Sequence, residues 1–230
     1  MLVTFNRKEN LYMKIDLHVH TSEVSMCGQM PAREVVERYK DAGYDAIVIT
    51  NHFNLDTASH FERHGEPDFI KAYNYGYELA EEAGKELGMT VLKGFELRFN
   101  ENYNDYLLYG FPEDLEKDYK EIFAMRPRDF AKIASERDFL FYQAHPFRNG
   151  MVINHPGALF GIEVHNGHPD HDSRNDIARA WAEKYGLHMI SGSDCHFSRG
   201  VGQAGIITDA KVETMNDLVE VLRTDNYTLI

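Results

Sequence analysis

Short apolar runs with a β-strand composition alternate with amphipathic segments along most of the chain. Seven runs are typical of buried strands: residues 14–20, 44–52, 89–99, 105–111, 139–146, 161–167 and 187–196. The alternation of strand and helix patterns favours a parallel sheet. Most of the runs end in polar side chains able to bind a metal. Since the carboxyl ends of such strands meet at one edge, the pattern predicts a site there.

The segments between the runs predict helices. The clearest covers residues 31–43, in which Pro31 suits a first turn, apolar residues share one face and Gly43 ends the helix. The same plan predicts helices over 67–88, 127–138, 173–186 and 214–226. The last begins with a cap at Thr214 or Asn216.

The element order predicts an α/β fold, a closed or nearly closed barrel of seven β/α units. An open, doubly wound sheet is the alternative, but the first run lacks the glycine-rich phosphate loop of that class. Residues 53–66 and 147–160 lack a strong helical pattern and predict loops over a site. Without an internal repeat or linker, residues 13–230 read as one domain. Residues 1–12 precede an internal Met13 and are expected to be a disordered extension or an artefact of start-site choice.

Composition narrows the function. The formal net charge of -13 opposes nucleic acid or an anionic membrane as the main partner. With two cysteines and no apolar run of roughly 18 residues, the chain is expected to be soluble and cytoplasmic. Its 12 histidines are many for 230 residues, and several fall in short clusters, which is the first lead to a metal site.

The first cluster is DLHVH, in which His18 and His20 point to one side of a strand and lie about 6.6–6.8 Å apart along it. Two imidazoles so placed can bind one ion. Asp194 and His196 are likewise separated by two positions in the sequence and follow the small residues of ISGS. Taken alone, each pair is also explained by structural histidines or by a turn.

Three further candidates follow apolar runs: His52, Glu96 and His145. A glutamate at a strand end can bridge two cations about 3.5–4 Å apart, although Glu96 also has Lys93 and Arg98 nearby as salt-bridge partners. Seven ligand-type residues at five of the seven predicted strand ends together predict a metal site.

In the same order along the chain, the strings DLHVHT, VITNH, GFEL, AHP and GSDCH resemble the motifs of the polymerase and histidinol phosphatase (PHP) superfamily over roughly residues 13–208. The resemblance implies a distorted seven-stranded β/α barrel, TIM-barrel-like, with two or three Zn, Mn, Fe or Mg ions, in a family many of whose members hydrolyse phosphate esters. It implies a first metal held by His18, His20, Glu96 and Asp194. It further implies that Glu96 bridges to a second metal bound by His145, and that His52 and His196 serve a third.

The chain departs from the family pattern at three places. Asn51 stands where many members have Asp, the loop after the first motif offers Glu23 and Cys27 instead of a histidine or aspartate, and Asp105 is the substitute for another histidine ligand. Cys27 favours a soft metal such as Zn and Glu23 a harder one. These departures favour a site of two ions over one of three.

The expected chemistry is hydrolysis of a small phosphorylated molecule, by a water that the metals activate. Asp194 is expected to be essential for turnover, and His52 or His196, when not bound to metal, can orient the water or protonate the leaving oxygen. Arg148 and Arg199 follow strand-end histidines and are candidates to bind the phosphate or a carboxylate of the substrate.

Several functions compete with this hypothesis. A histidinol-phosphate phosphatase is one candidate within it, and activity on nucleotides or nucleic-acid ends ranks next. A metal-dependent amidohydrolase also uses an HxH pair, a bridging ligand and a late Asp in a β/α barrel. An inactive metal-binding accessory domain is the non-enzymatic alternative, suggested by Asn51 and the altered fourth motif.

Overall fold

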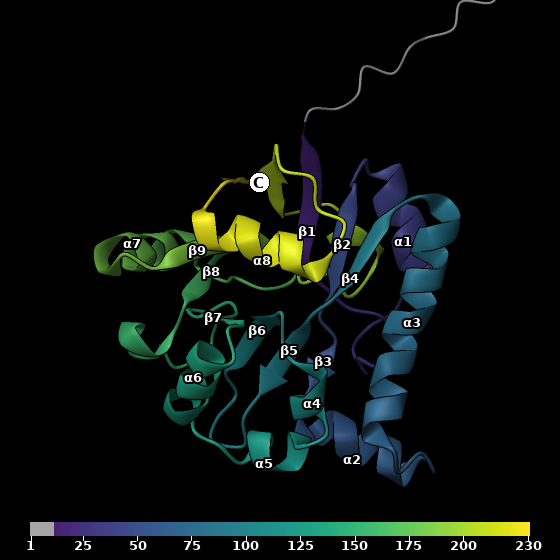
Figure 1. The fold of residues 1–230 in the computed structure, drawn as a ribbon, viewed down its shortest axis with the longest axis horizontal. Helices are drawn as coiled ribbons and strands as arrows, with labels where there is room; N and C mark the ends of the chain where they lie inside the picture. Colours follow the sequence, from purple (N-terminus) through teal and green to yellow (C-terminus); the bar gives the residue numbers. More distant parts are fainter. Residues whose placement is uncertain (1–11) are drawn as a thin grey trace, which may run out of the picture.

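The computed structural model describes residues 12–230, which form two β-sheets with helices around them (Figure 1). The predicted extension therefore lies outside the described residues, except for Tyr12. No helix in the described part of the chain has the length and apolar character needed to cross a membrane.

The first sheet has the order β11-β10-β1-β2-β4. Its parallel part consists of β1 (Met13–Val19), β2 (Ala46–Ile49) and β4 (Thr90–Lys93), and its antiparallel edge of β10 (Ile206–Thr208) and β11 (Thr228–Leu229). The five residues from Ile15 to Val19 are all buried, as expected for a strand covered on both faces.

The second sheet has the order β3-β5-β6-β7-β8-β9. It consists of β3 (His52–Phe53), β5 (Phe95–Arg98), β6 (Asp105–Tyr109), β7 (Leu140–Gln143), β8 (Gly161–Asn166) and β9 (His188–Gly192). Here the expectation of a parallel sheet is only partly met, because β6 is antiparallel to both neighbours. The connection 99–104 is shorter than the dozen or so residues that a parallel crossover needs, so β6 must turn back.

The predicted strand 89–99 is wrong as a single element, because β4 and β5 belong to different sheets. The chain changes sheet at Gly94, where a Cβ atom would lie 2.8 Å from the Val48 side chain and 2.9 Å from that of Thr50. Only glycine allows so close an approach. The sheets also meet where Val19 pairs with Cys195 in a parallel bridge. Residues 12–230 thus have the predicted α/β architecture, while regular closure of a seven-stranded barrel is not detected.

The five predicted helices are confirmed as α1 (Ala32–Asp41), α3 (Phe69–Leu87), α6 (Pro127–Glu136), α7 (Asn175–Tyr185) and α8 (Met215–Thr224). Of the two proposed caps of α8, Thr214 is the one used, in a capping box with Asp217. The long α3 runs beside α1 along one side of the molecule (Figure 1).

The segment 53–66, predicted to be a loop, contains α2 (Leu55–Arg63). Asn54 caps this helix by accepting a hydrogen bond from the Thr57 amide, a local signal that the sequence analysis overlooked. The short helices α4 (Glu113–Glu116) and α5 (Tyr119–Phe123) were also missed. In 147–160 the structure has only a 3₁₀ turn, η1 (Pro156–Ala158), so the predicted loop is confirmed there.

Candidate metal centre

Four of the predicted ligands converge where β1, β5 and the segment after β9 meet. We call His18, His20, Glu96 and Asp194 the inner group; each is at most 2% exposed. His18 Nε2 lies 3.2 Å from Glu96 Oε1 and 3.5 Å from Asp194 Oδ1. His20 Nε2 lies 3.4 Å from Glu96 Oε2 and 3.4 Å from Asp194 Oδ1.

These separations agree with metal coordination better than with hydrogen bonding. Within residues 12–230, His18 Nε2, His20 Nε2 and Glu96 Oε2 are buried atoms without a hydrogen-bond partner, which is costly unless an ion binds them. For metal–ligand distances of about 2.0–2.2 Å, the edges of a coordination tetrahedron are about 3.3–3.6 Å long. The four separations above, 3.2–3.5 Å, are close to those lengths, so these residues fit a divalent cation.

Hydrogen bonds place the Nδ1 protons of His18 and His20 on the side of each ring that faces away from Glu96 and Asp194. Glu163 Oε1 lies 2.9 Å from His18 Nδ1, and a carboxylate accepts the proton of that nitrogen. Ser25 Oγ lies 3.0 Å from His20 Nδ1 and donates its own hydrogen to Asn51 Oδ1, so Nδ1 of His20 must be the donor. Each ring, when neutral, thus presents an Nε2 lone pair to the inner group.

The electrostatics of the inner group suit a cation. In the metal-free protein, burial disfavours the charged rings of His18 and His52, but carboxylates that include Glu96 outweigh it and raise the pKa of both rings well above the usual range. Burial opposes ionisation of Glu96, but these protonated rings outweigh it and hold the pKa of this carboxyl well below its usual range. Asp194 likewise has a pKa well below its usual range, because His18 and hydrogen bonds from His196 and His20 overcome desolvation. The pKa of His20 is lowered by burial and by His196 and His52. Two ionised carboxylates beside a neutral imidazole form an apt ligand set.

His145 and Asp194 have unusual backbones. Their φ angles are 28° and 51°, in the left-handed region that non-glycine residues rarely adopt. Such conformations cost of order 1–3 kcal/mol each and persist where the surroundings require them. Each residue lies two positions after the last residue of a strand. The side chain of His145 reaches Glu96, and that of Asp194 reaches His18 and His20.

At the second predicted metal position, one of the three candidate ligands already forms an ion pair with an arginine. His145 Nε2 lies 3.1 Å from Glu96 Oε1 and 3.9 Å from Asp105 Oδ2, so the structure does bring these three residues together. Arg98, however, donates to both carboxylate oxygens of Asp105, at 2.8 and 3.0 Å. Asp105 can therefore bind an ion only if it gives up part of this pair.

The outer group, Cys27, His52 and His196, lies on the solvent side of the inner group. Cys27 Sγ is 3.2 Å from His52 Nε2, which is 3.5 Å from His196 Nε2. Burial disfavours the thiolate, but His196 and His52 outweigh it and lower the pKa of Cys27 to about 6. Burial is also overcome at His196, whose pKa is raised to about 9 by Asp194 and Cys27.

A cavity of about 380 Å³ opens over both groups. Arg148 reaches it from beyond β7 and donates to Asp194 Oδ2 at 2.6 Å and to Asn166 Oδ1 at 2.8 Å. His168 and His171 also line it, although the sequence suggested only a solvated loop there. Burial lowers the pKa of His168 to about 4, so this imidazole is neutral at neutral pH.

Two predicted site residues lie elsewhere. Both carboxylate oxygens of Glu23 accept from the Ala32 amide, at 2.9 and 3.1 Å, so Glu23 caps the start of α1. Arg199 is largely exposed and pairs with Asp170, outside the residues that line the cavity.

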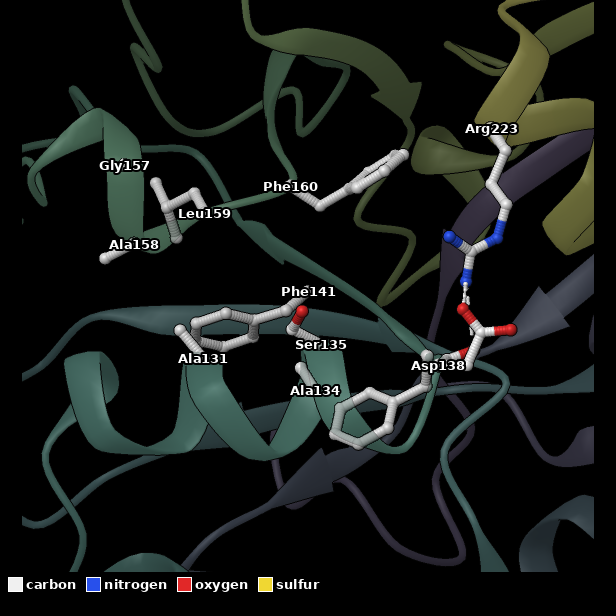
Figure 2. A pocket seen from close by; sticks show the side chains of 11 residues that line it. Ala131, Ala134, Ser135, Asp138, Phe141, Gly157, Ala158, Leu159, Phe160 and Arg223 are labelled. Atoms are coloured by element: carbon white, nitrogen blue, oxygen red, sulfur yellow. Dashed lines mark hydrogen bonds and ion pairs between the residues drawn. The ribbon is translucent and has the colours of Figure 1, made fainter.

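A second hollow of about 330 Å³ lies between α6, the η1 turn and α8 (Figure 2). Most of its lining residues have apolar side chains, and Arg223 and Asp138, which also line it, form an ion pair with 2.7 Å between Nη2 and Oδ1. None of the predicted ligands lines it. The chemistry-bearing residues therefore belong to the first cavity.

Comparison with known proteins agrees with this description. A family model described as PHP-associated (PHP_C) matches residues 172–227. No curated protein sequence matches the chain.

Three solved structures share the fold. The first, from Bacteroides vulgatus, is a two-domain protein containing a predicted PHP-like metal-dependent phosphoesterase, with 24% identity and a TM-score of 0.67 over 95% of this chain. This chain spans 64% of that protein. PsfC from Pseudomonas syringae has 19% identity and a TM-score of 0.66, covering 95% of this chain and 91% of its own.

The third is an amidohydrolase from Chromobacterium violaceum with bound sulfate and no metal, at 16% identity and a TM-score of 0.56, covering 90% of this chain and 96% of its own. At these identities the likeness concerns the fold. Together with the motif order, the family match over residues 172–227 and the shared fold make the chain similar to proteins of the PHP superfamily.

Proposed function

We propose that this protein is a metal-dependent phosphoesterase that hydrolyses a small phosphorylated molecule. The observation that carries the proposal is the inner group, in which two histidines and two carboxylates stand at the edge lengths of a coordination polyhedron with buried, unpartnered ligand atoms. When bound at such ligands, divalent cations lower the pKa of water and offset charge on a phosphoryl group.

The cavity beside the inner group supports a small substrate. Its volume of about 380 Å³ is near the lower end of the range for small-molecule sites. Arg148 is the candidate to bind the phosphate: its guanidinium is largely buried at the cavity wall, and its Nε has no hydrogen-bond partner among the described residues. A phosphate in the cavity can pair with the charge of this guanidinium while Nη2 keeps Asp194 in place.

His52 and His196 turn Nε2 toward one another at the cavity. A free imidazole there can give a proton to the leaving oxygen of the substrate, and the raised pKa of His196, about 9, keeps such a ring charged at neutral pH. Asp194 and Cys27 both contribute to this raised pKa.

The test is reconstitution of the full chain, stripped with chelator, with Mn²⁺ or Zn²⁺, followed by turnover of phosphomonoesters, phosphodiesters and amides. We expect phosphate release from monoesters and its loss, by about a thousandfold or more, in Asp194→Asn. The matched control is Asp170→Asn, which alters an exposed carboxylate outside the cavity lining and should leave turnover within about twofold.

Two other outcomes of this test would favour the rival functions. Hydrolysis of amides but not of phosphate esters would favour an amidohydrolase, the activity named for one of the similar structures. Stoichiometric metal binding without turnover of any substrate class would favour an accessory domain.

A further inference from the structure

A third hollow lies next to the cavity of the metal centre. It has a volume of about 490 Å³, and its lining consists of residues 54–56, where β3 leads into α2, and residues 98–103, at and after the end of β5. Arg98 lines both the hollow and the cavity. A molecule held by its phosphate at the inner group can therefore extend past this side chain into the hollow, which we call the side pocket.

Strand register places the side pocket one step beyond the metal ligands. β3 and β5 are parallel, with His52 opposite Glu96, and Asn54 continues β3 in extended backbone, with φ of -154° and ψ of 172°. Because alternate residues of a strand face the same way, the residues two positions on, Asn54 and Arg98, share the face of those two side chains. They lie about 6.6 Å further along the strands. A phosphate ester bound at the inner group can thus place its alcohol part in the side pocket.

Two asparagines of the side pocket are oriented by hydrogen bonds. Asn54 Oδ1 accepts from the Thr57 amide, and Asn102 Oδ1 accepts from the Asn104 amide, each at 2.9 Å. A backbone amide can only donate to the side-chain oxygen, so in both asparagines the Nδ2 group is the part able to donate to a ligand. The oxygen atoms of a hydroxylated molecule can accept from these two groups.

The charges of the side pocket disfavour an anionic alcohol part. Arg98 donates through Nε and Nη2 to the Asp105 carboxylate, which offsets its charge and leaves Nη1 as a donor. Asp56 and Glu101 line the pocket as exposed carboxylates. A second phosphate or carboxylate on the substrate would meet these like charges. Neutral hydroxyl groups, which both donate and accept, match this lining better.

Two exposed apolar side chains also line the side pocket. Tyr103 is 71% exposed and Leu55 is 48% exposed. Scattered exposed apolar residues are ordinary, but these two share one hollow beside the metal centre, as apolar residues do at ligand-binding grooves. A tyrosine ring has a flat apolar face and a polar hydroxyl. This combination fits a ligand ring that bears both C–H and hydroxyl groups.

We propose that the side pocket binds the alcohol part of the substrate, and that this part is an uncharged ring rich in hydroxyl groups, as in a sugar monophosphate. The inference deepens the proposed function and rests on it, because the metal centre must hold the phosphate. Asparagine amides donate to ring oxygens, carboxylates accept from ring hydroxyls, and Tyr103 packs against the ring. In hydrolysis the water oxygen bonds to phosphorus, the bond from phosphorus to the ester oxygen breaks, and that oxygen takes a proton to leave as a sugar hydroxyl.

The test compares esters that share the phosphate and differ in the alcohol. The full chain, reconstituted with Mn²⁺, is assayed for phosphate release from glucose 6-phosphate, ethyl phosphate and adenosine 5′-monophosphate. We expect kcat/KM to be highest for glucose 6-phosphate. It should exceed the value for ethyl phosphate by at least about 10-fold, because the side pocket adds two or more hydrogen bonds, each giving about 2–10-fold.

Two substitutions alter the side pocket with little effect on the fold. Asn102→Asp keeps the oxygen that accepts from the Asn104 amide but removes the donor, and Tyr103→Ala removes an exposed ring. Each should lower the preference for glucose 6-phosphate over ethyl phosphate by about 3–10-fold. Tyr75→Ala is the matched control and should leave the preference within about twofold, since Tyr75 is 55% exposed and lines neither the side pocket nor the cavity. Circular dichroism and metal content are measured for all three variants.

Three results overturn the inference and leave the proposed function standing: equal kcat/KM for glucose 6-phosphate and ethyl phosphate, a higher value for adenosine 5′-monophosphate, or an unchanged preference in both variants. Absence of phosphate release from every ester refutes the proposed function instead. The side pocket is then tested by calorimetric titration of the metal-loaded protein with glucose 6-phosphate. Binding that weakens in Tyr103→Ala but not in Tyr75→Ala supports the side pocket, and equal or absent binding overturns it.

Discussion

The inner and outer groups of the centre are built differently. The inner group is buried, lies on or directly beside strands, and consists of two histidines and two carboxylates. The outer group includes an exposed cysteine from the loop after β1, and His52, whose side chain is 16% exposed. One set of ligands is thus fixed by the sheets and the other depends on a loop.

The sheets hold the buried side chains of the inner group, whereas the outer group contains side chains that solvent can reach. Ser25 and Asn51 tie the loop to the sheet: Asn51 Oδ1 accepts from the Thr21 amide and from Ser25 Oγ, at 2.8 and 2.9 Å. Asn51 stands where many family members have Asp, and a neutral amide suffices here because it holds the loop through hydrogen bonds. Cys27, two residues beyond Ser25, is exposed, whereas every ligand of the inner group is at most 2% exposed.

The largest expected difference is in the rates at which the two cysteines of the metal-free protein react with iodoacetamide. Cys27 is exposed with a pKa of about 6, whereas burial and nearby carboxylates raise the pKa of the buried Cys195 to about 12. Since the thiolate is the nucleophile, iodoacetamide in the presence of chelator should modify Cys27 more than about a thousandfold faster at pH 7.

The pH profile of that modification sharpens the comparison. A thiol with lowered pKa is already a thiolate above that value, so the rate should rise through pH 6 and be flat from pH 7 to 9. Mass spectrometry of quenched samples gives both rates. A midpoint near the ordinary thiol value of about 8.5 would mean that His52 and His196 do not act on the sulfur.

Much of the inner group could be predicted from the sequence, because strand alternation alone puts His18 and His20 on one side. A lone ligand-type residue at the end of an apolar run likewise pointed to Glu96 and His145. Glu163 was missed, although it too is a lone carboxylate within an apolar strand, GIEV. The same rule, extended from strand ends to strand interiors, would have found it.

Other features depend on tertiary contacts that no local pattern encodes. The left-handed turn at Asp194, the change of sheet at Gly94 and the capture of Asp105 by Arg98 each require a partner distant in space or a backbone held by its surroundings. Arg148 and Arg199 illustrate the limit: both follow a strand-end histidine, yet only Arg148 lines the cavity.

These two arginines give the second prediction. Arg148→Ala should lower kcat/KM for a phosphate ester by about 100-fold, as expected when a charged hydrogen-bonding group at the substrate is lost. Arg199→Ala removes only an exposed ion pair with Asp170, and such pairs contribute about 0–1 kcal/mol, so its kcat/KM should change by less than about twofold. Metal content is measured in both variants. Equal effects of the two substitutions would contradict the assignment of Arg148 to the substrate.

The smallest expected effect is a loss of metal affinity in the inner group when Glu163, which hydrogen-bonds to His18, is replaced. Glu163 accepts from His18 Nδ1, from the His145 amide and from Asn166 Nδ2, each at 2.9 Å. Glu163→Gln keeps the size of the side chain but substitutes an amide nitrogen for one acceptor, so one of these donors loses its partner. The affinity of the inner group for metal should fall by about 10-fold, the lower end of the range for such residues.

Glu116→Gln is the matched control for Glu163→Gln, since Glu116 is another buried carboxylate and pairs with Lys93 instead of a candidate ligand. Titration of stripped protein with Mn²⁺ reports on the inner group, and the rate of Cys27 modification by iodoacetamide reports on the outer group. If Glu163 acts through His18, the first measurement changes and the second does not, because neither Cys27 nor His52 hydrogen-bonds to Glu163 in the described chain. A loss of equal size in both would mean that the two groups form one cooperative site, and the distinction between a rigid inner and an accessible outer group would fail.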